Sequence, residues 1–183
     1  RRQRQMCIRD RNVHDADMEP IEAVYGKTES GMTIIEADLF LQGKKPIVDR
    51  SSYGLGEVIA AALENDAQHI VISLGNIASF DGGAGMLQAL GAKYYNDEGE
   101  PIDTSKGVNV LKYIRHVDLS GLNPRLSKTR FQLVSDFSSK MYGKASEIMQ
   151  VYPLLGISRE EAAAVDNLVS VSYTHLRAHE TRG

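Results

Sequence analysis

A glycine-rich turn between an apolar run and a helix-forming run constrains the fold of this chain more than any other feature. Residues 69–74 (His-Ile-Val-Ile-Ser-Leu) are rich in β-branched side chains, which is typical of a strand covered on both faces. The turn Gly75-Asn-Ile-Ala-Ser-Phe-Asp81-Gly-Gly-Ala-Gly85 follows the strand. Residues 84–90 then predict a short helix with Gly91 as its C-cap.

A second helix is expected before the strand. Residues 57–65 are good helix formers, and four apolar residues share one face at helical spacing: Val58, Ile59, Ala62 and Leu63. The order helix, strand, loop, helix favours an α/β layer with a parallel sheet.

Other segments predict a β-rich part. Alternation over residues 21–26 and a β-rich run at 32–37 predict an antiparallel hairpin. The remaining expected elements are strands at 92–95 and 129–135, a helix at 108–114 with Val108, Leu111 and Ile114 facing inward, and a helix from the capping box Ser158-Arg-Glu-Glu161 to about residue 169.

The two ends differ from the body of the chain. Residues 1–11 and 171–183 resemble translated sequencing-adapter DNA, so we predict non-native tails there and a folded unit at 12–170. A nucleic-acid arm or a transit peptide is the functional alternative for the basic start. The tails hold seven of the 21 basic and two of the 24 acidic residues, which leaves 14 basic against 22 acidic residues and a net charge of −8 for the body.

Composition excludes several classes of protein. An acidic body disfavours sequence-independent nucleic-acid binding, because such binding needs Lys and Arg against phosphates. No apolar run approaches the roughly 20 residues of a membrane helix. The single cysteine, Cys7, excludes an internal disulfide framework and suits a cytoplasmic location. His175 and His179 lack an H-E-x-x-H context, so we assign no residue as a metal ligand on this basis.

The glycine-rich turn carries the candidate chemistry. Gly82, Gly83 and Gly85 let the backbone approach a ligand closely, and Asp81 has the chemistry to hold Mg²⁺ or to accept a proton from a hydroxyl. The alternative is that Asp81 only caps a helix while the glycines relieve a tight turn. Spacing alone leaves both open, because the pattern is neither G-x-x-x-x-G-K-[ST] nor G-x-G-x-x-G.

Three blocks of sequence resemble the bacterial glycerate kinase family. They are Ser51-Ser-Tyr-Gly-Leu-Gly-Glu57, Asp81-Gly-Gly-Ala-Gly-Met-Leu-Gln-Ala-Leu-Gly91 and Asp118-Leu-Ser-Gly-Leu-Asn-Pro-Arg-Leu126. The resemblance implies two α/β domains, one inserted into the other, with a parallel or mixed sheet flanked by helices, a β-rich inserted portion and an active site between the domains. It also implies phosphorylation of a hydroxyl of D-glycerate by ATP with Mg²⁺.

The resemblance implies roles for particular residues. Asp81 and Asp136 are the expected catalytic carboxylates, although Asp136 also reads as a turn residue after a strand. The expected nucleotide-binding residues are Ser52, Gly54, Gly56, Gly82, Gly83 and Gly85.

This chain departs from the family pattern at several polar positions. Ile77 and Phe80 replace a hydroxyl and an amide, Ser138 stands where the family has a carboxylate, and Leu155 lies near a family lysine. These changes favour a second hypothesis, a catalytically impaired relative that binds a small hydroxy acid or a nucleotide without turnover. A generic dinucleotide-binding domain is a third and weaker hypothesis, because an acidic ribose-binding residue is missing from the expected position.

Overall fold

The computed structural model describes residues 6–75, 78–135 and 140–180, with side chains described from residue 12 to 174 between the same gaps. Its main sheet has the order β1-β2-β3-β4-β8. The strands are β1 (Met6–His14), β2 (Pro20–Lys27), β3 (Met32–Glu36), β4 (His69–Leu74) and β8 (Arg130–Ser135).

The main sheet is mixed. The pairs β1–β2 and β2–β3 are antiparallel, and the register Gly26↔Ile34 confirms the predicted hairpin. The pairs β3–β4 and β4–β8 are parallel. This confirms the parallel sheet that the order helix, strand, loop, helix predicts. The buried residues of β4 are Ile70 and Ile72, while its other four residues are half-buried.

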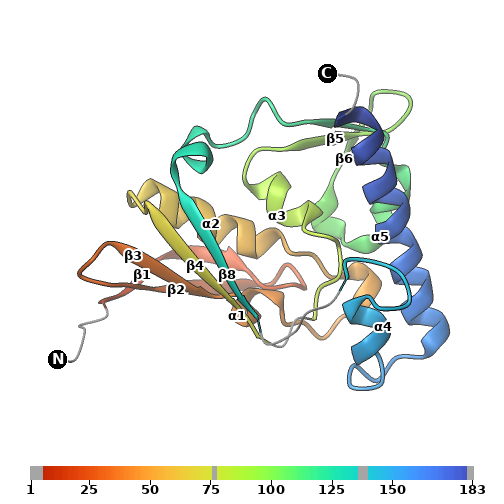
Figure 1. Ribbon diagram of the computed structural model, residues 1–183, viewed down its shortest axis with the longest axis horizontal. Coiled ribbons are helices and arrows are strands. Elements are labelled where there is room, and N and C mark those ends of the chain that lie inside the picture. Colours follow the sequence, from red (N-terminus) through yellow and green to blue (C-terminus); the bar gives the residue numbers. More distant parts are fainter. Residues whose placement is uncertain (1–5, 76–77, 136–139, 181–183) are drawn as a thin grey trace.

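A second, antiparallel sheet has the order β6-β5-β7. It contains β5 (Lys93–Tyr95), β6 (Pro101–Ile102) and β7 (His116–Asp118). In Figure 1 the β5–β6 ribbon lies at the opposite end of the molecule from the β1–β3 strands.

Nine helical segments connect and cover these sheets among the described residues. They are α1 (Asp38–Leu41), η1 (Ile47–Asp49), α2 (Tyr53–Glu64), α3 (Ala84–Ala89), η2 (Thr104–Lys106), η3 (Val108–Tyr113), η4 (Pro124–Lys128), α4 (Glu147–Val151) and α5 (Arg159–Glu180). The segment predicted as a helix at 108–114 is a 3₁₀ helix, and Val108, Leu111 and Ile114 are buried as expected. A repeat of three residues suits a 3₁₀ helix as well as an α-helix, so the sequence did not distinguish the two.

The described side chains form two apolar clusters. The first joins the main sheet to α1 and α2 and includes Ile35, Phe40, Val58, Leu63 and Ile70. The second joins α3, β5, η3, α4 and α5, with Tyr94, Leu111, Ile148 and Val165 among its members. Each fully buried side chain of this size contributes about 1.5–3 kcal/mol, so each cluster is a substantial core.

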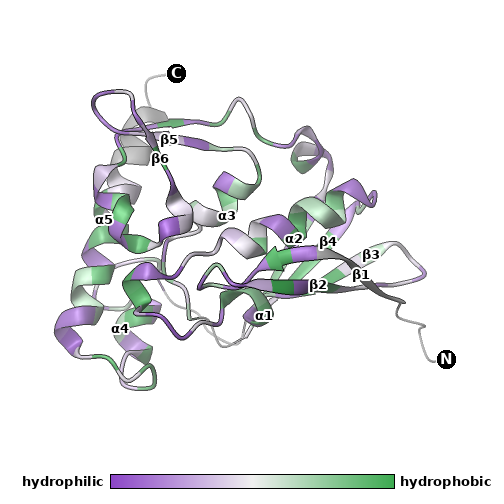
Figure 2. Ribbon diagram, turned by 180° about the vertical axis from the view of Figure 1, so that it is seen from behind, coloured by the Kyte–Doolittle hydropathy of each residue, from purple (hydrophilic) through white to green (hydrophobic). Residues whose placement is uncertain are grey.

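The long helix α5 is amphipathic. Its Ser158 hydroxyl accepts a hydrogen bond from the Glu161 backbone N–H at 3.1 Å, and the Glu161 carboxylate accepts one from the Ser158 N–H at 2.8 Å. This is the predicted capping box. Ala162, Val165 and Val169 are buried, and Figure 2 shows hydrophobic and hydrophilic residues alternating along α5.

Both segments predicted as tails contribute backbone to regular elements. Residues 6–11 belong to β1 and pair with β2, and residues 171–180 continue α5 beyond the expected end near residue 169. Their non-native origin stays a prediction. No helix in the described ranges is long and apolar enough to cross a membrane.

Candidate functional site

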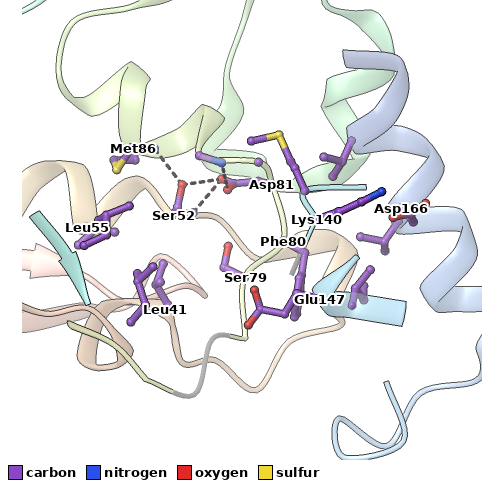
Figure 3. A pocket seen from close by; sticks show the side chains of 18 residues that line it. Leu41, Ser52, Leu55, Ser79, Phe80, Asp81, Met86, Lys140, Glu147 and Asp166 are labelled. Atoms are coloured by element: carbon purple, nitrogen blue, oxygen red, sulfur yellow. Dashed lines mark hydrogen bonds between the residues drawn. The ribbon is translucent and has the colours of Figure 1, made fainter. Parts of the chain in front are cut away.

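A pocket of about 440 Å³ opens between the two apolar clusters, and we call it the central pocket. One wall comes from the start of α2 and the glycine-rich turn, which contribute Ser52, Leu55, Ser79, Phe80, Asp81, Gly82, Gly83 and the α3 residue Met86. The opposite wall comes from residues 140–148 and from α5 (Figure 3). Residues 79–83 of the glycine-rich turn therefore line this pocket.

Asp81 lies at the centre of a hydrogen-bond cluster. Its Oδ2 accepts hydrogen bonds from the Ser52 N–H at 2.8 Å, the Ser52 hydroxyl at 2.9 Å, the Gly85 N–H at 3.1 Å and the Ser51 hydroxyl at 3.4 Å. Its Oδ1 accepts one from the Gly83 N–H at 3.0 Å. The Ser52 hydroxyl in turn accepts a hydrogen bond from the Met86 N–H at 3.0 Å.

The cluster gives Asp81 a structural role. The residue is only 2% exposed, and five donors already occupy its carboxylate. It holds the N-terminus of α2 against that of α3, as in the capping alternative drawn from the sequence. The five donors leave this carboxylate little free acceptor capacity for a metal ion or a substrate hydroxyl, and its catalytic role stays a prediction.

The charge of Asp81 also acts on its neighbourhood. Burial of the Tyr94 phenol, together with the nearby Asp81 carboxylate, raises the pKa of Tyr94 far above its ordinary value. Tyr94 is 2% exposed, so it stays neutral and contributes to the second apolar cluster.

Two of the glycines expected to bind nucleotide line the central pocket. Gly82 and Gly83 have φ values of +63° and +79°, which side chains rarely adopt. Gly85 lies behind them, because a Cβ there would come within 2.2 Å of the Ser51 hydroxyl oxygen. The structure thus places Gly82 and Gly83 where backbone can meet a ligand and gives Gly85 a packing role.

Gly54 and Gly56 lie inside α2 and are buried. A Cβ at Gly54 would be 1.6 Å from the His14 carbonyl oxygen, and one at Gly56 would be 2.3 Å from the Met86 carbonyl oxygen. These glycines let α2 pack closely on the end of β1 and on α3, and that packing accounts for them without a nucleotide.

Ser79 contributes an unsatisfied polar group to the central pocket. The residue is 8% exposed, and its hydroxyl has no hydrogen-bond partner among the described residues. Burying a hydroxyl without a partner costs free energy, so such a group is a candidate for contact with a ligand or water. Its neighbour Phe80 also lines the pocket, so this ring contributes an apolar surface to it.

Three charged residues line the opposite wall: Lys140, Glu147 and Asp166. Asp166 accepts hydrogen bonds from the Gly143 N–H at 2.9 Å through both of its oxygens. Burial raises the pKa of Glu147 above its ordinary value. Lys140 supplies positive charge to the same pocket that contains Gly82 and Gly83.

Sequence reasoning missed these three residues. Lys140 and Glu147 fall between the predicted strand at 129–135 and the capping box, and Asp166 falls inside the predicted helix that follows it; no motif marked any of the three. Asp136, the second expected catalytic carboxylate, lies outside the described residues, as do Ile77 and Ser138. The described part of the chain holds no group of three His, Cys, Asp or Glu residues that could bind a metal ion.

The chain is similar to known proteins along nearly all of its length. The model of the glycerate kinase family matches residues 2–181. The chain is 35% identical over 141 residues to a glycerate 2-kinase of Escherichia coli K12, covering 77% of this chain and 35% of that protein. It is 29% identical over 160 residues to a glycerate kinase of Bacillus subtilis 168, covering 83% of this chain and 41% of that protein.

A solved structure matches the fold over nearly the whole chain. It is the crystal structure of a Salmonella typhimurium LT2 protein provisionally assigned as glycerate kinase 2, with a TM-score of 0.86 and 28% sequence identity. The alignment covers 96% of this chain and 48% of that protein. The chain therefore spans about a third to a half of the relatives that it matches.

Proposed function

Because the chain belongs to the glycerate kinase family, we propose that it forms part of an enzyme that transfers the γ-phosphoryl group of ATP to a hydroxyl of D-glycerate. The observation that carries the proposal is the central pocket, which Gly82, Gly83 and Lys140 all line. Phosphoryl transfer depends on positioning and charge neutralisation more than on covalent chemistry. Exposed backbone and a lysine suit a phosphate.

Each proposed part has a definite task. The backbone at Gly82 and Gly83 approaches the phosphates, and Lys140 offsets their negative charge. Mg²⁺ bound with the nucleotide would neutralise phosphate charge, and Asp81, whose carboxylate already accepts five hydrogen bonds, would have little capacity left to hold it. We place the enzyme in the cytoplasm.

The test is a coupled assay of ADP release by the full-length protein with ATP and Mg²⁺. We expect slow turnover that requires D-glycerate. Propionate, an acid without a hydroxyl, is the matched control and should release no ADP. ADP release that is the same with D-glycerate and propionate would refute the kinase proposal. Asp81→Ala is a poor control here, because Asp81 holds the fold together.

The alternative is a relative that binds without turnover. Phe80 in the pocket wall favours it, because the ring removes a polar contact that the family pattern provides. Saturable binding of D-glycerate in calorimetry, with no glycerate-dependent ADP release, would support this alternative.

A further inference from the structure

Transfer of a phosphoryl group to a hydroxyl calls for a group that takes the hydroxyl proton. Three described carboxylates line the central pocket, namely Asp81, Glu147 and Asp166. Their hydrogen-bond partners distinguish them. Asp81 accepts five hydrogen bonds and is almost fully buried. Both carboxylate oxygens of Asp166 accept a hydrogen bond from the Gly143 N–H.

Glu147 differs from the other two. Among the residues that the structure describes, its carboxylate has no hydrogen-bond or ion-pair partner, and it is half-buried at the start of α4. Burial raises its pKa, which moves the group toward the range in which a carboxylate is an effective base near neutral pH. The other titratable side chains that line the same pocket are Lys140, Asp81 and Asp166.

A second, independent observation comes from the same pocket. The buried hydroxyl of Ser79 lacks a partner among the described residues and lines the same pocket. In Figure 3 the Ser79 hydroxyl and the Glu147 carboxyl lie close together in the view, on the side of Phe80 away from Asp166. A hydroxyl that both donates and accepts, in the same pocket as a carboxylate without a described partner, suits an alcohol group of a ligand.

We propose that Glu147 is the catalytic base of this site and that Ser79 orients the hydroxyl of the substrate toward it. The inference rests on the proposed function. The substrate oxygen forms a bond to the γ-phosphorus, and the bond from that phosphorus to the β–γ bridging oxygen breaks. ADP leaves with the electron pair, while the hydroxyl proton passes to the Glu147 carboxylate and then to water.

The experiment compares Glu147→Gln with wild type in the full-length protein, with ATP, Mg²⁺ and D-glycerate. We expect kcat to fall by about 10²- to 10⁴-fold, the usual contribution of a general base, with KM for D-glycerate changed less than about 3-fold. The acid limb of the wild-type kcat–pH profile should be absent in the variant. Glu160→Gln, an exposed change of the same kind on α5, should keep wild-type kcat.

Folding of the variant is checked separately. The raised pKa of Glu147 means that the folded state binds more protons than the unfolded state between its ordinary and raised pKa values, so its ionisation lowers stability as pH rises through that window. Glu147→Gln removes this effect. The variant should therefore unfold in urea at a concentration no lower than wild type at pH 7.

The outcomes separate the two proposals. A wild-type enzyme without glycerate-dependent ADP release refutes the kinase function itself. An active wild type with a Glu147→Gln variant within about 3-fold of its kcat, or with the acid limb retained, overturns only the role of Glu147. In the same series Ser79→Ala should raise KM for D-glycerate, and an unchanged KM would overturn the role of Ser79. Thr33→Val, which removes another unpartnered buried hydroxyl outside the pocket, is its control.

Discussion

At the scale of single residues, the carboxylate of Asp81 holds two helix N-termini together. Its five hydrogen bonds connect the starts of α2 and α3. The sequence identified the residue and also both of its possible roles, capping and catalysis. It did not predict that Ser51 and Ser52 donate hydrogen bonds to Asp81, because these serines are about 30 residues away in the chain and no local pattern joins them to it.

Removal of this carboxylate should weaken the fold. Asp81→Ala leaves several buried N–H and O–H groups unpaired, at about 1–3 kcal/mol for each group that finds no new partner. We expect the free energy of unfolding in urea to fall by about 3 kcal/mol or more. Glu29→Ala, an exposed acidic residue in a turn, should change it by less than about 0.5 kcal/mol. Equal stability of the two variants would contradict the structural role of Asp81.

At the scale of elements, local pattern predicted most of the helices and strands that carry the site. The β-branched run over residues 69–74 became β4, and the capping box began α5. The start of α2 was placed four residues late, at Glu57 in place of Tyr53, because glycines are poor helix formers. Their presence in α2 is explained by tertiary packing against β1 and α3, which helix propensity does not contain.

A substitution tests that packing. In Gly54→Ala the new Cβ meets the backbone carbonyl of His14, so β1 and α2 must separate. Although alanine favours a helix by about 1 kcal/mol, we expect a net loss of about 1–3 kcal/mol in urea unfolding. Gly26→Ala is the control, because its Cβ would have no atom nearer than 4.0 Å. A Gly54→Ala variant as stable as Gly26→Ala would show that α2 does not pack on β1 in this way.

At the scale of the whole molecule, the sequence predicted an α/β fold. It did not predict the position of the pocket, because the pocket lies between the two apolar clusters. The central pocket draws residues from the first cluster, such as Leu55, and from the second, such as Val165. Contacts between segments so distant in the chain leave no local signal. For this reason Lys140 and Glu147 emerged only from the structure.

The edge of the main sheet provides a test at this scale. Strand β8 ends the strand order, and all six of its residues are exposed, including Phe131, Leu133 and Val134. Parallel strands are usually covered on both faces, and an apolar edge strand offers unpaired backbone groups to another chain. We therefore expect the 183-residue chain to self-associate as its concentration rises, as measured by sedimentation velocity.

A charge on the strand should suppress this association. In Val134→Lys the positive side chain stands on the edge strand, where lysine is a natural protection against pairing, so the weight-average sedimentation coefficient should stay near the monomer value. Leu154→Lys makes a similar change at an apolar residue that is 87% exposed, away from the sheet, and should associate like wild type. If both lysine variants behave alike, the contact does not involve β8. If Val134→Lys alone is monomeric, the edge strand is the surface through which two copies meet.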